Sequence, residues 1–249
     1  MNILVVGAGG VGASMASIAE TREFFDSFVL ADISRETAEA AIKALDDPGK
    51  FTAEQVDASS VDALVALIER TKADVIVNAC DPRLNPQIFE AAFRAKCSYI
   101  DMAMNLSQPH PLDPFEKPGK MLGADQLAAD AQWADHGILA LVGMGVEPGL
   151  SNVFARYAAD YIFDEIHEIG VRDGSNLSID GYDFAPTFSI WTTIEECLNP
   201  PLVWEKKRGF YTTDCFSEPE IFHFPAGIGP VECVNVEHEE VVLIPREVK

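Results

Sequence analysis

Three glycines near the N-terminus have the spacing of a phosphate-binding loop. Gly7, Gly9 and Gly12 form a G-x-G-x-x-G motif directly after one expected strand and at the start of an expected helix. Gly7 permits the tight turn, Gly9 lets the backbone approach a pyrophosphate, and Gly12 lets the helix pack closely against the strand. The helix would present unpaired N–H groups and its positive dipole end to the phosphates. The motif predicts dinucleotide binding by Gly7, Ala8, Gly9, Gly10, Val11 and Gly12.

Asp32 stands at the end of the second expected strand, twenty residues after Gly12. An acidic side chain at this place accepts hydrogen bonds from the adenosine ribose of NAD. Because its charge repels a 2′-phosphate, the sequence favours NAD as cofactor, while Arg35 close by leaves NADP open. The alternative is that Asp32 only caps the helix that follows.

Two further strand ends are expected to face the same crevice, because ligands of open α/β sheets collect at the carboxyl ends of the strands. The residues at these ends are Asp57, Ala58, Asn78, Ala79 and Cys80. We expect Asp57 to meet the adenine edge and residues 78–80 to line the path toward the nicotinamide. Asp57 is equally suited to a plain turn before Ser59 and Ser60. A Walker-type phosphate site is disfavoured, since no Lys-Ser/Thr pair follows the glycines.

Short apolar runs alternate with amphipathic stretches over about the first 145 residues, which is the rhythm of a parallel sheet with crossover helices. The expected strands are residues 2–6, 27–32, 51–57, 73–79, 97–103 and 137–144. The expected helices are residues 12–21, 34–45, 60–71, 86–95 and 124–136. Ser34 and Ser60 stand at the N-cap positions of two of these helices. The pattern predicts an α/β fold with a Rossmann-type doubly wound sheet.

The pattern changes at two places along the chain. Residues 105–123 carry prolines and glycines and are expected to form a long insertion, either a functional lid or a surface loop. Beyond residue 150 longer apolar runs at 164–174, 222–229 and 231–246 predict strands, with helices at 150–162 and 189–200. We therefore expect a Rossmann domain over residues 1–150. A partial α+β second domain, with a mixed or antiparallel sheet for substrate binding and dimerisation, would cover residues 151–249.

The composition excludes several classes of partner. Of 249 residues, 48% are hydrophobic and 23% are charged, as in ordinary globular proteins, and the formal net charge of −22 repels nucleic acids and anionic lipids. No apolar run is long enough to span a bilayer, and no secretory leader precedes the first strand. Five cysteines without a C-x-x-C pair read as free thiols of a cytoplasmic protein. Neither they nor the five histidines have metal-ligand spacing, so we expect no metal.

Several segments together resemble the saccharopine dehydrogenase (saccharopine reductase) family, which includes lysine 6-dehydrogenase-like and carboxynorspermidine dehydrogenase-like bacterial members. The most specific are "CSYIDMA" at 97–103 and "GILALVGMGVEPGLSN" at 137–152, beside "VVGAGGVG" and "ADVIVNACDP". The resemblance covers about the first 170 residues well and continues more weakly to residue 246. It implies an NAD(P)-dependent oxidoreductase acting on a carbon–nitrogen bond of an amino-acid or polyamine-type substrate, with lysine metabolism as one setting.

The resemblance also implies substrate-binding residues, namely Asp101, Glu147, Pro148, Gly149 and Asn152. Asp101 would hold a substrate amino group at the nicotinamide side of the cleft, or else act as a buried cap or hydrogen-bond acceptor. Glu147 is a candidate amine ligand, whereas Pro148 and Gly149 are explained by the backbone turn alone. Asn152 would face the same crevice if a helix begins at Leu150.

The expected reaction moves a hydride from an amine-bearing carbon to the nicotinamide, after which water releases a carbonyl product and an amine. Such a site needs carboxylates for a cationic substrate, a base for the ammonium and walls that exclude water. The base candidates are His238 and Glu239, with Asp183 as a further one. Each of the three is more often a solvated or structural polar residue, since charged residues commonly line strand edges.

Other readings stay open. A homoserine or semialdehyde dehydrogenase is another Rossmann oxidoreductase, and the semialdehyde enzyme needs a nucleophilic cysteine, for which Cys80 is the residue to check. A catalytically incomplete NAD(P)-binding fragment or sensor is a third reading, since members of the family are usually longer and the second domain looks truncated. An uncovered sheet edge in a domain of this kind favours a homodimer.

Overall fold

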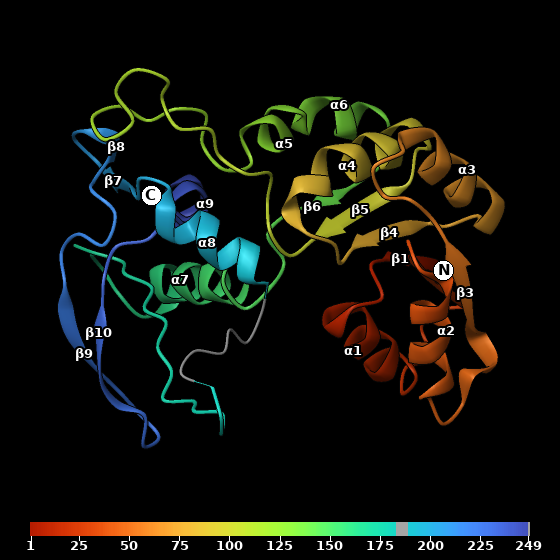
Figure 1. Cartoon of the computed structure of the whole chain (residues 1–249). Helices are drawn as coiled ribbons and strands as arrows, with labels where there is room; N and C mark the ends of the chain where they lie inside the picture. Colours follow the sequence, from red (N-terminus) through yellow and green to blue (C-terminus); the bar gives the residue numbers. More distant parts are fainter. Residues whose placement is uncertain (183–188, 249) are drawn as a thin grey trace. The chain divides into compact units, whose positions relative to one another are not determined.

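The computed structural model describes residues 1–182 and 189–248, and the chain divides into two compact units (Figure 1). The first unit comprises residues 1–105 and 123–145, and the second unit comprises residues 106–122 and 146–249. Most of the segment expected as an insertion, residues 106–122, therefore packs with the second unit.

The first unit contains a six-stranded parallel sheet in the order β3-β2-β1-β4-β5-β6. Its strands are β1 (Asn2–Val6), β2 (Ser27–Asp32), β3 (Phe51–Gln55), β4 (Val75–Asn78), β5 (Ser98–Asp101) and β6 (Ala140–Leu141). The strand order reverses between β1 and β4, where Val6 pairs with Ala31 on one side and with Asn78 on the other. This reversal creates the crevice in which doubly wound sheets bind ligands, so the predicted sheet is confirmed.

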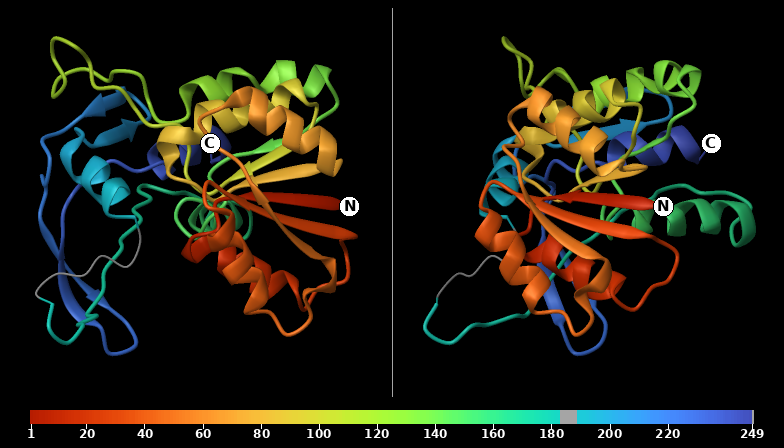
Figure 2. Two further views of the ribbon diagram at one scale, coloured as in Figure 1. Left: turned by 45° about the vertical axis from the view of Figure 1, so that its right-hand side comes forward. Right: turned by 90° about the vertical axis from the view of Figure 1, so that its right-hand side faces the viewer.

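Helices cover both faces of this sheet because β1 is apolar on both sides (Figure 2). Ile3 and Val5 belong to a core cluster with residues of α1 (Gly10–Ala19) and α2 (Arg35–Lys43). Leu4 and Val6 belong to a second cluster on the other face. The helices that contribute to that cluster are α3 (Val61–Thr71), α4 (Asn85–Arg94) and α6 (Asp130–Asp135).

Short elements and caps complete the first unit. The 3-10 helices η1 (Pro48–Lys50) and η2 (Pro82–Leu84) and the helix α5 (Ala124–Ala128) join the longer elements. Ser34 accepts a hydrogen bond from the Thr37 N–H and Ser60 accepts one from the Ala63 N–H, so both predicted N-caps are confirmed. These caps begin α2 and α3 directly after the strand ends that bear Asp32 and Asp57.

The second unit has three helices and two antiparallel ribbons among its described residues. They are α7 (Leu150–Tyr161), α8 (Ile190–Leu198), α9 (Glu240–Glu247), β7 (Leu202–Glu205) with β8 (Gly209–Thr212), and β9 (Glu220–Phe224) with β10 (Gly229–Cys233). The antiparallel pairing was expected, and α7 and α8 match the expected helices. No helix in the described ranges is long and apolar enough to cross a bilayer.

Two of the strand predictions for this unit are wrong, and the strand predicted at 222–229 is instead the end of β9, a turn at 225–228 and the first residue of β10. Residues 164–174 contain no strand, because no segment among residues 1–182 and 189–248 pairs with them in a ladder. Of residues 231–246, only the first three continue β10, whereas residues 240–247 form α9. An apolar run as short as 241–244 suits either a strand or a helix. Here Glu240 in the first turn and Arg246 in the last turn complement the helix dipole.

Leu64→Ala tests the core of the first unit, because Leu64 is fully buried between α3 and the sheet. We expect the variant to lose about 2–5 kcal/mol of stability from lost burial and the cavity that remains. Leu139→Ala is the matched control, since Leu139 is 56% exposed, and should change stability by less than about 0.5 kcal/mol. Urea unfolding followed by circular dichroism measures both, and equal effects would contradict this packing.

Candidate functional site

The glycine loop between β1 and α1 is closed tightly on its inner side. Gly7 has a φ of 104°, and a Cβ added there would lie 2.6 Å from the Ala79 carbonyl oxygen. A Cβ added to Gly12 would lie 1.8 Å from the Gly7 carbonyl oxygen. Both positions therefore require glycine, one for its backbone conformation and both for space. The loop, β4 and α1 meet at this contact.

The outer side of the same loop is open. A Cβ added to Gly9 or Gly10 would meet no atom within 4 Å. Gly9 is the N-cap of α1 and provides no side-chain cap, so the first-turn N–H groups face outward without a capping group. An open glycine turn at an uncapped helix N-terminus fits a pyrophosphate, which these N–H groups would bind.

Asp32 connects the end of β2 to the glycine loop. Its carboxylate accepts a hydrogen bond of 2.8 Å from the Ala8 N–H and one of 3.0 Å from the Ser34 N–H. Ser34, and not Asp32, is the N-cap of α2. A carboxylate has about four acceptor positions, so capacity remains for ribose hydroxyls. The geometry therefore places an acidic acceptor beside the loop, as dinucleotide binding requires.

A pocket of about 380 Å³ lies at the ends of β2 and β3 against α3. It is lined by Ile33, Gln55, Val56, Asp57, Ala63, Ala66, Leu67 and Arg70. The Asp57 carboxylate accepts hydrogen bonds from the Ser59 hydroxyl (2.7 Å) and the Ser59 N–H (2.9 Å), and these bonds lower the pKa of Asp57. Asp57 is thus both the turn residue and a pocket residue, while Ala58 is buried.

Asn78 and Cys80 at the end of β4 are held by internal hydrogen bonds. The Asn78 amide donates to Asn85 Oδ1 (2.7 Å) and to the Tyr99 hydroxyl oxygen (3.2 Å), and its oxygen accepts from the Cys80 N–H. The Cys80 thiol donates to the Val6 carbonyl oxygen at 3.3 Å. Burial raises the pKa of Cys80 to about 12, so this thiol stays protonated at neutral pH.

Asp101 is a buried acceptor with 1% of its surface exposed. It accepts hydrogen bonds from the Tyr99 hydroxyl (2.9 Å), the Gln126 amide (2.7 Å) and the Gly143 N–H (2.7 Å). The Met144 N–H also bonds to the Asp101 carbonyl oxygen. This geometry favours the structural alternative for Asp101, which ties β5 to α5 and to the loop after β6.

The E-P-G turn of the second unit leads directly into α7. Gly149 has a φ of 126°, and its N–H donates to Asn152 Oδ1 at 2.9 Å. Asn152 therefore caps the helix that Gly149 begins, and Pro148 is buried after a cis peptide bond with Glu147. Burial and the nearby Asp173 charge raise the pKa of the half-buried Glu147. Of these residues, Glu147 has the chemistry of an amine ligand.

A cluster of carboxylates surrounds His238 in the second unit. The His238 ring bonds to Glu240 and lies 3.6 Å from Glu239 and 3.9 Å from Glu196. Burial lowers the pKa of His238, but the hydrogen bond and charge of Glu240 and the charges of the other two raise it to about 9. Burial raises the pKa of Glu196 to about 7. The structure thus brings His238 and Glu239 together, as acid and anion partners.

Two further observations concern the carboxylate cluster around His238. Burial raises the pKa of Glu237, whose carboxylate accepts from Ser107 and Asn199, so the cluster continues into the segment 106–122. Among residues 1–182 and 189–248, no group of three such side chains is arranged as a metal site. Asp183, the further base candidate, lies outside the described residues.

Sequence reasoning missed the partners that hold these groups. Tyr99 precedes Asp101 by two residues on one strand, so period-two alternation places both on the same face of β5. Gln126 and Gly143 reach Asp101 only through tertiary folding. Glu196 is on α8, and no local pattern relates it to His238.

Comparison with known proteins gives the chain a family. The family described as the saccharopine dehydrogenase NADP binding domain matches residues 3–141. The chain is 32% identical over 255 aligned residues to a carboxynorspermidine synthase of Vibrio cholerae, covering 97% of this chain and 58% of that protein. It is 30% identical over 194 residues to a carboxyaminopropylagmatine dehydrogenase of Synechocystis, covering 78% of this chain and 46% of that protein.

A solved structure agrees at the level of fold. The apo saccharopine dehydrogenase (L-Glu forming) of Saccharomyces cerevisiae superposes with a TM-score of 0.61 at 16% identity, covering 95% of this chain and 50% of that one. The chain spans about half the length of these relatives. The match over residues 3–141 includes β1 to β6 and the whole glycine loop. The chain therefore belongs to the saccharopine dehydrogenase family, through its NADP-binding domain.

Proposed function

We propose that the chain is part of an NAD(P)-dependent oxidoreductase that acts on a carbon–nitrogen bond of an amino-acid or polyamine-type substrate. The observation that carries this proposal is the glycine loop, open at Gly9, with an uncapped helix terminus and an acidic acceptor at Asp32. The names of the relatives, a carboxynorspermidine synthase and a carboxyaminopropylagmatine dehydrogenase, support a substrate that carries amines.

Each part of the first unit has a distinct task in this proposal. The N–H groups of the first turn of α1 bind the pyrophosphate, and Asp32 accepts from the adenosine ribose. Asp57 and Ala58 border the adenine, and residues 78–80 border the nicotinamide side. Bound there, the nicotinamide exchanges a hydride with the substrate carbon. Asp101 positions β5 and the loop after β6 and does not contact substrate in this proposal.

The second unit contains half-buried carboxylates of the kind that bind cationic groups. Glu147 and Glu196 are half-buried carboxylates whose pKa is raised by burial, so a bound ammonium group would stabilise their charged forms. His238 is protonated at neutral pH and lies 3.6 Å from Glu239 in the same cluster, so this pair contains a proton donor beside a carboxylate. No metal ligand set accompanies them in the described residues, which suits an organic cation.

The alternatives make different demands on the same residues. A semialdehyde dehydrogenase needs a thiolate, and the pKa of about 12 at Cys80 disfavours one. A homoserine dehydrogenase shares the cofactor cradle and is distinguished by the substrate that it oxidises. An NAD(P)-binding sensor needs the cradle alone and is distinguished by binding without turnover.

We further propose a homodimer in the cytoplasm that binds no nucleic acid. The net charge of −22 supports the exclusion of nucleic acid, and five unpaired cysteines support a reducing compartment. Light scattering of the purified chain measures the oligomeric state directly.

A binding and turnover experiment tests the function. NADH and NADPH are titrated against the chain by calorimetry, and NAD(P)⁺ reduction is then followed with carboxynorspermidine, saccharopine and lysine. We expect dinucleotide binding and turnover of one of the amine substrates. Binding without turnover favours the sensor, and absence of binding by either nucleotide overturns the proposal.

Gly9→Ala separates the binding role of the loop from its structural role. The added methyl meets no protein atom, so the melting temperature should stay within about 2 °C, while the methyl blocks the pyrophosphate and weakens NADH binding by about tenfold or more. Gly12→Ala should instead destabilise the fold, because its Cβ would clash with the Gly7 carbonyl. Wild-type affinity in Gly9→Ala would place the phosphates elsewhere.

The carboxylate cluster predicts how stability depends on pH. Because the folded pKa of His238 is about 9, against an ordinary 6.5, its contribution is full below pH 6.5 and is lost as the pH rises through 9. Glu196 has a pKa of about 7 in the folded protein, above its ordinary 4.5. The folded protein therefore also loses stability at this group as the pH rises from 4.5 to 7. We expect the melting temperature to fall by about 4 °C or more from pH 6.5 to 9.5.

His238→Gln should flatten that decline, whereas His167→Gln should leave it unchanged, because His167 is 80% exposed and pairs only loosely with Glu165. Differential scanning calorimetry at several pH values measures all three proteins. A His238→Gln variant with the wild-type pH profile would show that the ion pairs contribute nothing.

A further inference from the structure

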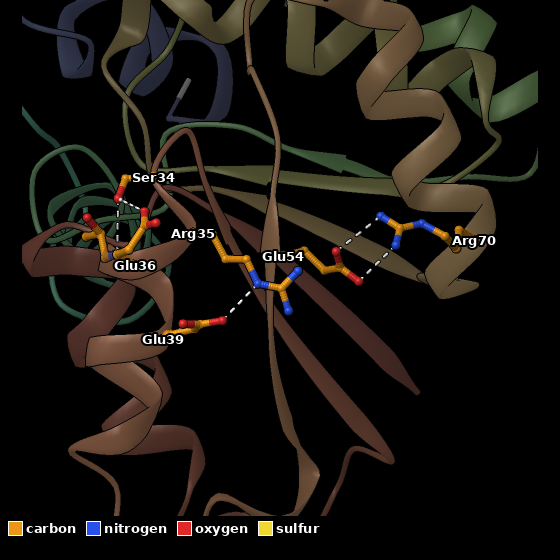
Figure 3. A network of polar contacts seen from close by, with 7 residues as sticks. Ser34, Arg35, Glu36, Glu39, Glu54 and Arg70 are labelled. Atoms are coloured by element: carbon orange, nitrogen blue, oxygen red, sulfur yellow. Dashed lines mark hydrogen bonds and ion pairs between the residues drawn. The ribbon is translucent and has the colours of Figure 1, made fainter.

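A row of charged side chains crosses the outer strand β3 from α2 to α3, beside the pocket at the ends of β2 and β3 (Figure 3). Arg35, the first residue of α2, donates from Nε to Glu39 Oε1 at 2.8 Å. Arg70 of α3 donates to both oxygens of Glu54 on β3, at 3.0 and 3.3 Å. The Glu54 charge also acts on Arg35. Both arginines are therefore engaged with carboxylates of the protein itself.

Both arginines belong to elements that adjoin the strand ends where the adenosine ribose is expected. Arg35 follows Asp32 by three residues in the turn from β2 to α2, and Arg70 lines the pocket that Ile33 and Asp57 also line. An arginine in this region is what accommodates the 2′-phosphate of NADP in dinucleotide-binding folds. In this chain a 2′-phosphate would have to compete with Glu39 for Arg35 and with Glu54 for Arg70.

The surrounding charge adds to this competition. Asp32 and Asp57 stand at the two strand ends, and Glu36 lies in the first turn of α2. The backbone N–H of Glu36 and the Ser34 hydroxyl lower the pKa of Glu36, so it is anionic at neutral pH. With Glu39 and Glu54, five carboxylates face two arginines in this region. A 2′-phosphate would bring about 1.5–2 further negative charges into it.

We propose that this row of ion pairs makes the chain select NAD(H) over NADP(H), with Glu39 and Glu54 as the specificity-determining residues. The inference rests on the proposed dinucleotide function and deepens it. Asp32 alone favours a ribose with a free 2′-hydroxyl, and the two glutamates withhold the arginines that would otherwise offset it. The chain thus differs in cofactor preference from the NADP binding that the family description names.

Binding of nucleotide fragments tests the proposal without any turnover. Calorimetry at low ionic strength compares NADH with NADPH, and ADP-ribose with 2′-phospho-ADP-ribose. In each pair the ligand without the 2′-phosphate should bind at least about tenfold more tightly. Glu39→Gln/Glu54→Gln should narrow this ratio by about tenfold, because both arginines become free for the phosphate. Glu69→Gln/Glu90→Gln removes two exposed helix carboxylates that are not the ion-pair partners of Arg35 or Arg70 and should leave the ratio unchanged.

Two further arms make the result decisive. Adding Arg35→Ala and Arg70→Ala to the Glu39→Gln/Glu54→Gln variant should abolish its gain in NADPH affinity. If the glutamine variant does not fold, the salt dependence of the wild-type ratio replaces it, since discrimination by exposed charges falls as salt rises.

Wild-type NADPH binding as tight as NADH binding, or a salt-independent ratio, overturns the inference and leaves the proposed function intact. An unchanged ratio in a folded Glu39→Gln/Glu54→Gln variant also overturns it. Failure of all four ligands to bind overturns the proposed function as well.

Discussion

The close approach of three backbone segments at Gly7, Gly12 and Ala79 is the constraint on which the first unit depends. The Gly7 carbonyl lies where a Gly12 side chain would be, and Gly7 itself presses on the end of β4. This contact brings β1, α1 and β4 together at the point where the strand order reverses. Because no side chain fills the inner side, the turn is short and its N–H groups point outward. The same absence of side chains that permits the packing therefore creates the anion site.

A buried polar network holds the neighbouring strand ends around that contact. Asn78, Tyr99 and Asp101 are linked in series, and Asp101 is completed by the Gln126 amide and the Gly143 N–H. A buried carboxylate is costly unless its oxygens are hydrogen-bonded, so each of these donors offsets part of the desolvation of Asp101. Removing a donor would leave a buried acceptor without a hydrogen bond, and the folded protein would then bear the desolvation cost of that acceptor without compensation. The network thus fixes β4, β5 and the loop after β6 with a geometry that apolar packing alone does not specify.

An element could be predicted from the sequence where its pattern is long and where a second sequence feature supports it. The strands from β1 to β5 were predictable because each is a short run between turn residues and a helix follows each of the first four, with Asp32 and the glycines at fixed places in that pattern. The segment 241–244 has four apolar residues and no second signal, so strand and helix were indistinguishable there. Asp101 was predicted as a site residue, yet whether it meets substrate or Tyr99 depends on tertiary partners. The same holds for Glu54 and Arg70, which are sixteen residues apart and meet only because α3 returns along β3.

The acidity of the chain explains why its anion site is made from backbone. With 40 acidic and 18 basic residues, a phosphate approaches against a repulsive field, and Arg35 and Arg70 are already paired with carboxylates. Backbone N–H groups at a helix terminus cannot be neutralised in this way, since neighbouring carboxylates do not alter their number or direction, and their attraction acts at short range. A pyrophosphate can therefore bind where the loop leaves it room. An additional phosphate at the ribose has no such backbone site, because Ser34 already caps α2 and Asp32 already accepts from the Ser34 N–H. In a chain of this charge, backbone geometry determines where phosphate binds, and side-chain pairing determines how much phosphate is accepted.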